Sequence, residues 1–267
     1  MKSVDIVIAT HKKYAMPKNK YYIPLQVGAA INNTQLNIKT DNTGKNISEK
    51  NLNFCELTGL YWIWKNSEAD YKGLVHYRRH FTLKKGYIRP KNRMNSVLNE
   101  AEIKKLTEEY DVILPKKRNY RIETLWDHYV HTLYPEPLEK TREIIKKKYP
   151  EYLKEFDNLK TRKSAHMFNM LIAKKEIFDE YSKWLFDILF ELEESLKTSK
   201  KEYDTFHSRF YGRISELLFD VWLYTKHPDD LKIKELRVLD IEGVNWFKKG
   251  SSFLAAKFFG KKYKKSF

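Results

Sequence analysis

The sequence contains a single cysteine, Cys55, and lacks any long apolar run. One cysteine excludes a disulfide bond within the chain, and such sparing use of cysteine is typical of a reducing compartment. No stretch approaches the roughly 20 apolar residues that a membrane-spanning helix needs. The short apolar run from Val4 to Ala9 is interrupted by Asp5 and predicts a β-strand rather than a signal peptide. We therefore expect a cytoplasmic protein that does not cross a membrane.

Negative charge is also scarce: 35 Asp and Glu residues stand against 51 Lys and Arg residues, which gives a formal net charge of +16. Three kinds of partner would suit this charge, namely nucleic acid, anionic lipid and a phosphorylated substrate. The sequence has no helix-turn-helix, zinc-binding or RNA-binding motif, and no repeats or coiled-coil heptads. These absences weigh against nucleic acid, although the charge alone would permit it.

What is present is an alternation of strand-like and helix-like segments over 267 residues, of which 42% are hydrophobic. Strands are predicted at 4–9, 22–27, 73–77, 111–114 and 167–173, and helices at 49–65, 99–110, 175–197 and 214–224, with shorter helices between 123 and 159. Ser48 is expected to cap the first helix. This alternation predicts an α/β fold, in which a mostly parallel sheet is flanked by helices and carries helical additions.

Basic and polar side chains follow three of the predicted strands. They are Thr10, His11 and Lys12 after the first strand, His76, Tyr77, Arg78 and Arg79 after the third, and Lys116, Lys117 and Arg118 after the fourth. Ligands of parallel α/β sheets lie at the carboxyl ends of the strands. Each group alone is ordinary for the surface of a lysine-rich protein, but three groups on one edge would suit a phosphate-bearing ligand.

Two segments stand out by composition. Residues 56–66 have the sequence E-L-T-G-L-Y-W-I-W-K-N, and residues 73–79 have the sequence G-L-V-H-Y-R-R. They resemble the motifs E-L-T-x-x-Y-W-x-W-K-N and G-x-x-H-Y-R-R of a family of bacterial capsular and exopolysaccharide glycosyltransferases that was long catalogued as a domain of unknown function. Further segments similar to that family lie at 111–115, 168–172, 181–190 and 212–216, so the resemblance extends to about Leu239.

This resemblance implies a nucleotide-sugar-binding fold of the GT-A type and a hexosyltransferase activity. Enzymes with this fold often hold the nucleobase and ribose at the end of the first strand, which implies this role for residues 10–12. Residues 76–79 then lie where the donor diphosphate is expected, and Glu56 is a candidate acceptor for a sugar hydroxyl or, alternatively, a buried structural carboxylate. Because adjacent residues of a strand point to opposite faces, only one of Arg78 and Arg79 is expected to reach the phosphate.

The sequence departs from the GT-A pattern in one respect. It has no convincing Asp-x-Asp pair, which usually holds a divalent cation beneath the diphosphate. Glu68-x-Asp70 has the spacing but precedes the strand, and Asp240-x-Glu242 lies near the C-terminus. Arginines occupy the expected place, and guanidinium groups neutralise a leaving diphosphate without a metal. Metal-independent chemistry with no cofactor is therefore the expectation, and dependence on Mn²⁺ or Mg²⁺ is the alternative.

An inverting transferase also needs a general base near the acceptor hydroxyl. The candidates are Asp127, His128, His131, His166 and Glu216. Asp127 and His131 are four residues apart on one helix face, as a base and its orienting partner would be. Glu216 is also a favourable residue for the start of a helix, which is the structural alternative. Trp126 and Asn169 are expected to contact the acceptor, whereas Trp62 and Trp64 are expected in the core.

The C-terminal residues 244–267 contain seven lysines and no acidic residue. One side of a helix over this segment would carry Trp246, Phe247, Phe253, Leu254 and Phe258. An apolar stripe with dense positive charge is typical of a segment that lies among the headgroups of an anionic membrane. We therefore expect residues 1–243 to form the transferase domain and residues 244–267 to form a membrane-associating tail. A disordered basic tail and a helix docked on the domain are the alternatives.

Together these features predict a glycosyltransferase that works peripherally at the inner face of the plasma membrane. The expected donor is a nucleotide sugar, a UDP-sugar with galactose in first place. The expected acceptor is a polyprenyl-linked glycan of a capsule or another cell-surface polysaccharide. The alternatives from other classes are a nucleic-acid-binding protein and a non-catalytic scaffold of a polysaccharide assembly complex.

Overall fold

The computed structural model describes residues 2–197, 203–227 and 229–242, and the structural statements below refer to these residues. Its centre is an eight-stranded sheet in the order β3-β2-β1-β4-β5-β10-β6-β9, in which β4 also pairs with β9. The strands are β1 (Val4–Thr10), β2 (Tyr22–Gln26), β3 (Lys39–Thr40), β4 (Tyr71–His76), β5 (Arg79–Thr82), β6 (Val112–Pro115), β9 (Leu171–Lys174) and β10 (Ile233–Asp240). A second, two-stranded sheet joins β7 (Arg118–Asn119) to β8 (Ser164–Ala165).

The sheet is mixed, and the expectation of a mostly parallel sheet is wrong. Strands β3, β2, β1 and β4 are parallel to one another, and β10 is parallel to β6. Five of the nine pairings among the described residues are antiparallel. The reason is local: β4 turns back into β5 through a tight turn at Tyr77 and Arg78, and β9 runs against both β4 and β6.

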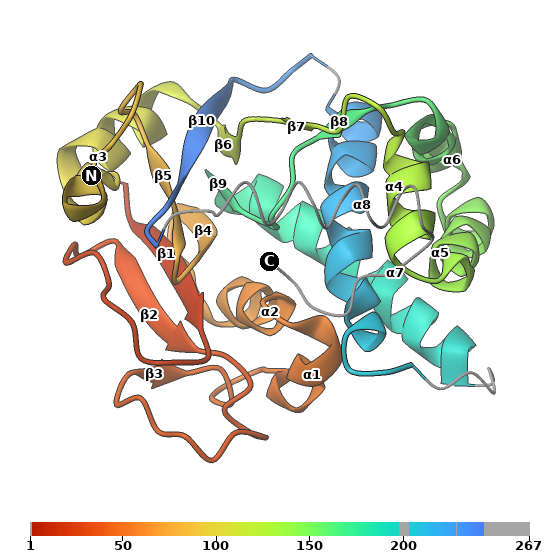
Figure 1. Cartoon of the computed structure of the whole chain (residues 1–267), viewed down its shortest axis with the longest axis horizontal. Coiled ribbons are helices and arrows are strands. Elements are labelled where there is room, and N and C mark those ends of the chain that lie inside the picture. Colours follow the sequence, from red (N-terminus) through yellow and green to blue (C-terminus); the bar gives the residue numbers. More distant parts are fainter. Residues whose placement is uncertain (1, 198–202, 228, 243–267) are drawn as a thin grey trace.

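Strand β1 shows how the sequence builds a hydrophobic core on each face of the sheet. Successive side chains of a strand point to opposite faces. Val7 and Ala9 belong to one buried cluster, and Ile6 and Ile8 belong to the other. Helices cover both faces (Figure 1). The first cluster is completed by α1 (Asn51–Phe54), α2 (Leu57–Asn66), α7 (Lys175–Lys197) and α8 (Phe210–Lys226), and the second by α3 (Glu100–Glu109).

Three further helices form the helical addition that was predicted between residues 123 and 159. They are α4 (Leu125–Thr132), α5 (Pro135–Lys148) and α6 (Leu153–Asp157). Helix α5 packs on α7 and α6 packs on α8, on the side that faces away from the sheet (Figure 1). Pro135 occupies the first turn of α5, where its missing N–H costs nothing. Among the described residues, no helix combines the length and apolar character needed to cross a membrane.

The helix predicted at 49–65 is broken. A short 3-10 turn (Ser48–Lys50) and α1 end at Cys55, whose φ of 51° is incompatible with a continuous helix, and α2 starts two residues later. Ser48 is not the expected cap, because it lies within the first turn, where its hydroxyl accepts from the Ala30 N–H at 3.0 Å and donates to Asp41 Oδ1 at 2.5 Å. The break at Cys55 places Glu56 at the entrance of α2, at a bend in the chain rather than within a regular helix.

Two strands also differ from the predictions. The late strand β9 begins at Leu171 rather than at Met167, because Phe168 and Asn169 have φ values of 82° and 52° and form a turn. Strand β10 was not predicted, since charged residues interrupt its apolar alternation. The expected tail, residues 244–267 with Trp246, Phe247, Phe253, Leu254 and Phe258, lies outside the described residues.

Candidate active site

Two of the three basic strand ends lie side by side. Strands β1 and β4 are parallel neighbours in which Ala9 pairs with His76, and the Tyr77 N–H donates to the Ala9 carbonyl at 3.1 Å. Residues 10–12 and 76–79 therefore share one edge of the sheet. The third group follows β6, which runs in the same direction as β4 because β9 is antiparallel to both strands, so it lies at the same edge of the sheet, beyond β9. There Lys117 covers the ring of Tyr224 on α8, and Arg118 covers the ring of Tyr120.

Aromatic rings and a lysine gather at this edge. The ring of Tyr77 makes edge-to-face contacts with His11 at 5.3 Å and with Tyr14 at 5.0 Å between centroids. The ammonium group of Lys12 lies 5.2 Å from the centroid of Tyr77. Thr10 is buried, and its hydroxyl donates to the Lys12 carbonyl at 2.6 Å, so it shapes the turn after β1. The arrangement offers ring faces and a cation to a planar, charged ligand.

A turn with unusual backbone conformation faces the end of β4. Phe168 and Asn169 are consecutive residues with positive φ, a conformation that costs free energy and persists only where its surroundings hold it. Three contacts hold it here. His76 Nε2 donates to the Phe168 carbonyl at 2.5 Å, the Phe168 N–H donates to Glu216 Oε1 at 3.0 Å, and the Arg79 guanidinium lies 4.8 Å from the Phe168 ring centroid.

Asn169 links this turn to Glu56 at the start of α2. Its Nδ2 donates to Glu56 Oε1 at 2.7 Å and to the Gly212 carbonyl at 3.0 Å. Its Oδ1 is buried and accepts no hydrogen bond from the described residues. We call Glu56, Asn169 and Glu216 the acid–amide centre. This centre joins α2, the β8–β9 turn and α8, three segments that are far apart in the sequence.

Two arginines that were not expected in the site lie at the start of α8: Arg209 directly precedes the helix, and Arg213 is in its first turn. Arg213 Nη1 donates to Glu216 Oε2 at 3.2 Å, and the Glu216 carboxylate raises the pKa of Arg213. The charges of Lys12, Arg209 and Arg78 lower the pKa of His11, after the larger effect of desolvation. Arg209 therefore lies close to the β1 and β4 ends. Arg209 is far from β1 and β4 in the sequence, so the sequence alone did not predict that it lies near their ends.

His76 and Arg79 are both partly withdrawn from water. Burial lowers the pKa of His76, and the nearby Arg79 charge acts in the same direction, against the Glu56 carboxylate. Because a carbonyl oxygen only accepts, His76 donates from Nε2 to Phe168. Burial, followed by the charge of Arg78, lowers the pKa of Arg79, and its Nε lies 4.0 Å from Asp240 Oδ2.

The Asp240-x-Glu242 pair, set aside in the sequence analysis, lies at the rim of this site. Asp240 is opposite Arg79 in the β5–β10 pairing. Burial and the Glu242 carboxylate raise the pKa of Tyr14 to about 12. Among the residues that the structure describes, no group of three or more His, Cys, Asp or Glu side chains is placed to hold a metal ion. Glu68 pairs with Lys175, and Asp70 accepts from Ser3, both away from the site.

The sequence and fold were then compared with known proteins. A family model described as a domain of unknown function (DUF4422) matches residues 5–227. The chain belongs to the DUF4422 family. It is also similar to a solved structure titled as the bifunctional glycosyltransferase WbbM in its apo form, with 32% sequence identity and a TM-score of 0.82. That match covers 90% of this chain and 46% of WbbM, so this chain spans about half the length of that protein. A search of curated proteins gave no match.

In this DUF4422 chain the expected pair of Asp127 and His131 does not form. His131 Nδ1 instead meets Glu123 Oε1 at 3.2 Å, and His128 Nδ1 meets Glu123 Oε2 at 3.1 Å. Glu123 is buried, so one carboxylate holds both histidines on α4. The sequence analysis missed Glu123 because it lies before the helix. Asp127 is exposed, and its backbone N–H donates to the Thr124 hydroxyl that caps α4.

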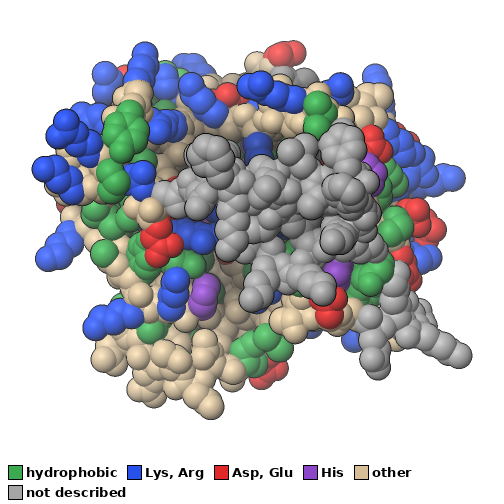
Figure 2. Space-filling model, in the orientation of Figure 1, with side chains coloured by type: hydrophobic (Ala, Val, Ile, Leu, Met, Phe, Trp, Pro, Cys, Tyr) green, Lys and Arg blue, Asp and Glu red, His purple; other side chains and the backbone are tan. Residues whose placement is uncertain are grey.

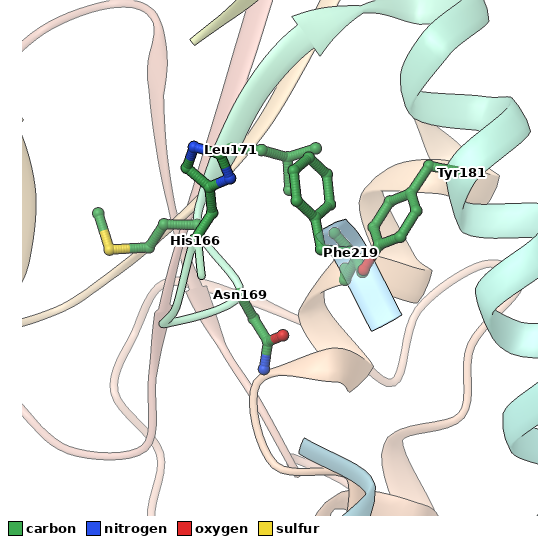
Figure 3. Close-up of a pocket in the computed structure, with 7 residues that line it drawn as sticks. His166, Asn169, Leu171, Tyr181 and Phe219 are labelled. Atoms are coloured by element: carbon green, nitrogen blue, oxygen red, sulfur yellow. The ribbon is translucent and has the colours of Figure 1, made fainter. Parts of the chain in front are cut away.

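His166 is buried and both its ring nitrogens are occupied. Nδ1 lies 2.5 Å from Asp220 Oδ1, and Nε2 lies 3.0 Å from Glu235 Oε1. His166 therefore ties the β8–β9 turn to α8 and β10, which is a positioning role. Figure 3 shows its ring in a small cavity with Asn169, Leu171, Tyr181 and Phe219. The cavity measures about 10 Å³, which is the size of one water molecule and far below that of a sugar.

Trp126, Trp62 and Trp64 all pack against other side chains of this chain. Trp126 packs edge-on against Phe156, and its ring is covered by Lys160, so it lies among the added helices. Trp62 is buried and donates to Thr43, and Trp64 stacks on Phe186 with ring centroids 5.8 Å apart. The expected core position is confirmed for Trp62, whereas Trp64 is partly buried and packs against the core from its edge.

Proposed function

We propose that this chain is a glycosyltransferase that moves a sugar from a nucleotide-sugar donor to a lipid-linked glycan. The observation that carries the proposal is that the carboxyl ends of β1 and β4 lie side by side, with Lys12 over the ring of Tyr77, next to the acid–amide centre. Arg78 and Arg209 add their charges at this edge. The family membership supports it, as does the likeness to half of a bifunctional glycosyltransferase. A phosphate-bearing leaving group and a hydroxyl acceptor need these two kinds of group next to each other.

The donor is proposed to lie along the β1 and β4 ends. The nucleobase and ribose contact the rings of His11, Tyr14 and Tyr77, and the diphosphate contacts Arg78 and Arg209. Arg79 keeps its place against Asp240 and the Phe168 ring, and so positions the turn rather than the phosphate. UDP is the expected nucleotide and galactose the expected sugar, as the family resemblance suggests.

Glu56 is the residue proposed to take the proton of the acceptor hydroxyl. Both carboxylate oxygens of Glu216 are engaged, by the Phe168 N–H and by Arg213. Glu56 uses Oε1 for Asn169, and no described residue hydrogen bonds to its Oε2. The buried Oδ1 of Asn169, beside it, accepts a hydrogen bond from a sugar hydroxyl. Asp127 and His131 stay candidates for the acceptor side, whereas His166 is better suited to positioning.

The leaving diphosphate is proposed to be neutralised by guanidinium groups without a metal or other cofactor. Arg78 and Arg209 carry fixed charges, which suit a leaving group whose negative charge grows in the transition state. Mn²⁺ or Mg²⁺ bound through Asp240 and Glu242 is the alternative. The acceptor is proposed to be a polyprenyl-linked glycan, which places the enzyme on the inner face of the plasma membrane, held by residues 244–267.

A thermal-shift measurement of nucleotide binding tests this proposal. UDP at about 100 times its Kd stabilises a folded protein by about 2.7 kcal/mol, which corresponds to roughly 5–10 °C for a chain of this size. Arg78→Ala and Arg209→Ala are expected to remove most of this shift, whereas Arg89→Ala, an exposed arginine of the β5–α3 loop, leaves it unchanged. If no nucleotide or nucleotide sugar shifts the melting temperature, the chain is a non-catalytic scaffold. Retention on nucleic acid instead would favour the nucleic-acid-binding alternative.

A further inference from the structure

The loop between β5 and α3 is strongly basic. No acidic residue occurs between Tyr71 and Asn99. Lys84, Lys85, Arg89 and Lys91 are exposed. None of these four side chains forms an ion pair with a described residue, whereas on the neighbouring helix α3 Lys104 and Lys105 pair with glutamates one turn later. Figure 2 shows Lys and Arg side chains gathered over the end of the molecule that carries α3 and β5.

Apolar side chains stand among these charges. Tyr87 is 80% exposed and Leu83 is 40% exposed. In Figure 2, hydrophobic side chains lie between the basic ones on this part of the surface. Because folding leaves these two side chains in water, they contribute little to the hydrophobic stability of the fold, and their apolar area is available to a partner.

The exposure of Tyr87 is built into the fold, because residues on both sides of it are fixed. The neighbouring Ile88 is buried, and the Gly86 carbonyl accepts a hydrogen bond from Arg237 on β10. The base of the loop is closed by the Thr82 hydroxyl, which donates to the Ser96 carbonyl at 2.5 Å. Anchors of this kind hold the ring outward in a fixed place.

We propose that this loop, Leu83 to Lys91, is a docking surface for an anionic membrane. The four cations lie against the lipid headgroups, and Tyr87 and Leu83 enter the interface between headgroups and acyl chains. Tyrosine is favoured at this depth because its ring is apolar and its hydroxyl is polar. A polyanion in water, such as a nucleic acid, would use the same cations but gives no reason for an exposed leucine beside them.

The loop also leads back to the candidate active site. Arg93 Nη1 donates to the Ile241 carbonyl at 3.4 Å, and the Ile241 N–H donates to the Arg78 carbonyl at 2.8 Å. Arg93 lies two residues beyond the docking surface, so the segment that directly follows this surface contacts the rim of the site. If the proposed function holds, a membrane bound here would present a lipid-linked acceptor beside Arg78. The docking itself does not rest on the proposed function, because it needs no donor and no turnover.

Vesicle sedimentation of the full chain tests the docking surface. The vesicles contain phosphatidylcholine with 30% phosphatidylglycerol, and pure phosphatidylcholine serves as the neutral arm. Each lysine near an anionic surface contributes about fivefold to binding, so Lys84→Ala with Lys85→Ala should lower the partition coefficient by about 30-fold. The matched control is Lys104→Ala with Lys105→Ala, which removes the same charge from α3 and should change it by less than threefold. Tyr87→Ser should lower the part of the binding that resists high salt.

The expected results distinguish a docking surface from a general effect of positive charge. The residues 244–267 are the same in every variant, so differences report on the loop. Equal losses for the loop pair and the α3 pair would show that only net charge matters, and absence of binding to anionic vesicles would also overturn the proposal. Loss of binding to a single-stranded oligonucleotide with unchanged vesicle binding would assign the loop to nucleic acid. Failure of nucleotide binding alone would refute the proposed function and leave the docking surface standing.

Discussion

Replacing Asn169 is expected to separate backbone strain from side-chain bonding in the acid–amide centre. Asn169 has a φ of 52° and donates to the Glu56 carboxylate at 2.7 Å. A hydrogen bond to a charged group contributes about 1.5–3 kcal/mol. Alanine at positive φ adds about 1 kcal/mol of strain, which glycine avoids. Asn169→Ala should therefore lower the free energy of unfolding by about 3 kcal/mol, and Asn169→Gly by about 2 kcal/mol.

Asn37 offers a matched control for this comparison. It also has positive φ, 55°, but it is exposed in the loop before β3 and has no carboxylate partner among the described residues. Asn37→Ala should cost only the strain, about 1 kcal/mol, and Asn37→Gly should be close to neutral. Urea denaturation of the four variants gives all the values, and the Asn169→Ala change should appear as a melting temperature lower by about 6–12 °C. Equal costs for Asn169→Ala and Asn37→Ala would show that the Glu56 contact adds nothing.

Three further predictions concern pH, metal and the tail. Burial lowers the pKa of His80 from 6.5 to about 4. Between these two pH values the unfolded chain binds a proton at His80 and the folded chain does not, so protonation favours unfolding. The free energy of unfolding should therefore fall by about 3 kcal/mol as the pH decreases from 6.5 to 4. Urea titrations at several pH values should show that this decrease in the free energy of unfolding is smaller in His80→Leu than in the wild type, and unchanged in His131→Gln. Transfer activity should survive EDTA, and loss that manganese restores would point to Asp240 and Glu242 as metal ligands. Deleting residues 244–267 should remove the salt-resistant vesicle binding that Tyr87→Ser leaves, and should lower activity on a lipid-linked acceptor far more than on a short soluble analogue. Equal losses on the two acceptors would make the tail part of the fold.

The elements with strong periodicity could be predicted from the sequence. The buried run of β1 and the long amphipathic helix α7, predicted at 175–197 and observed as Lys175–Lys197, follow from hydrophobic spacing alone. Helix α3 also follows, because Asn99 and Glu102 form a reciprocal cap at its start. In each case the residues within the element itself favour the observed helix or strand, and contacts with distant segments do not change it.

The strand directions could not be predicted because they depend on pairing between distant segments. The turn at Tyr77 and Arg78 reverses the chain after β4, and the half-exposed β10 fills the place between β5 and β6. Neither leaves a clear local pattern. The prediction of a parallel sheet therefore holds for β1 to β4 and is wrong for β5 and β9.

The candidate site was predicted in part for the same reason. The adjacency of residues 10–12 and 76–79 follows from two consecutive parallel strands, and the structure brings them together. The roles within the acid–amide centre depend on side-chain contacts between segments more than 40 residues apart, such as Asn169 with Glu56. Arg209 and Glu123 were missed because no motif marks them. The predicted pairing of Asp127 with His131 was wrong because it was based on helical spacing alone, whereas His131 pairs with the buried carboxylate of Glu123, which precedes the helix.

Sugar transfer by the wild type and by Glu56→Gln tests the central proposal most directly. Glutamine keeps an oxygen for the Asn169 amide but cannot take a proton, so the fold and the UDP affinity should be retained. The account predicts that the wild type transfers labelled sugar from a nucleotide sugar to a polyprenyl-linked acceptor, with release of the nucleotide, and that Glu56→Gln lowers kcat by about 10²–10⁴. A wild type that releases no nucleotide from any sugar donor, or a Glu56→Gln variant with full activity, would contradict it.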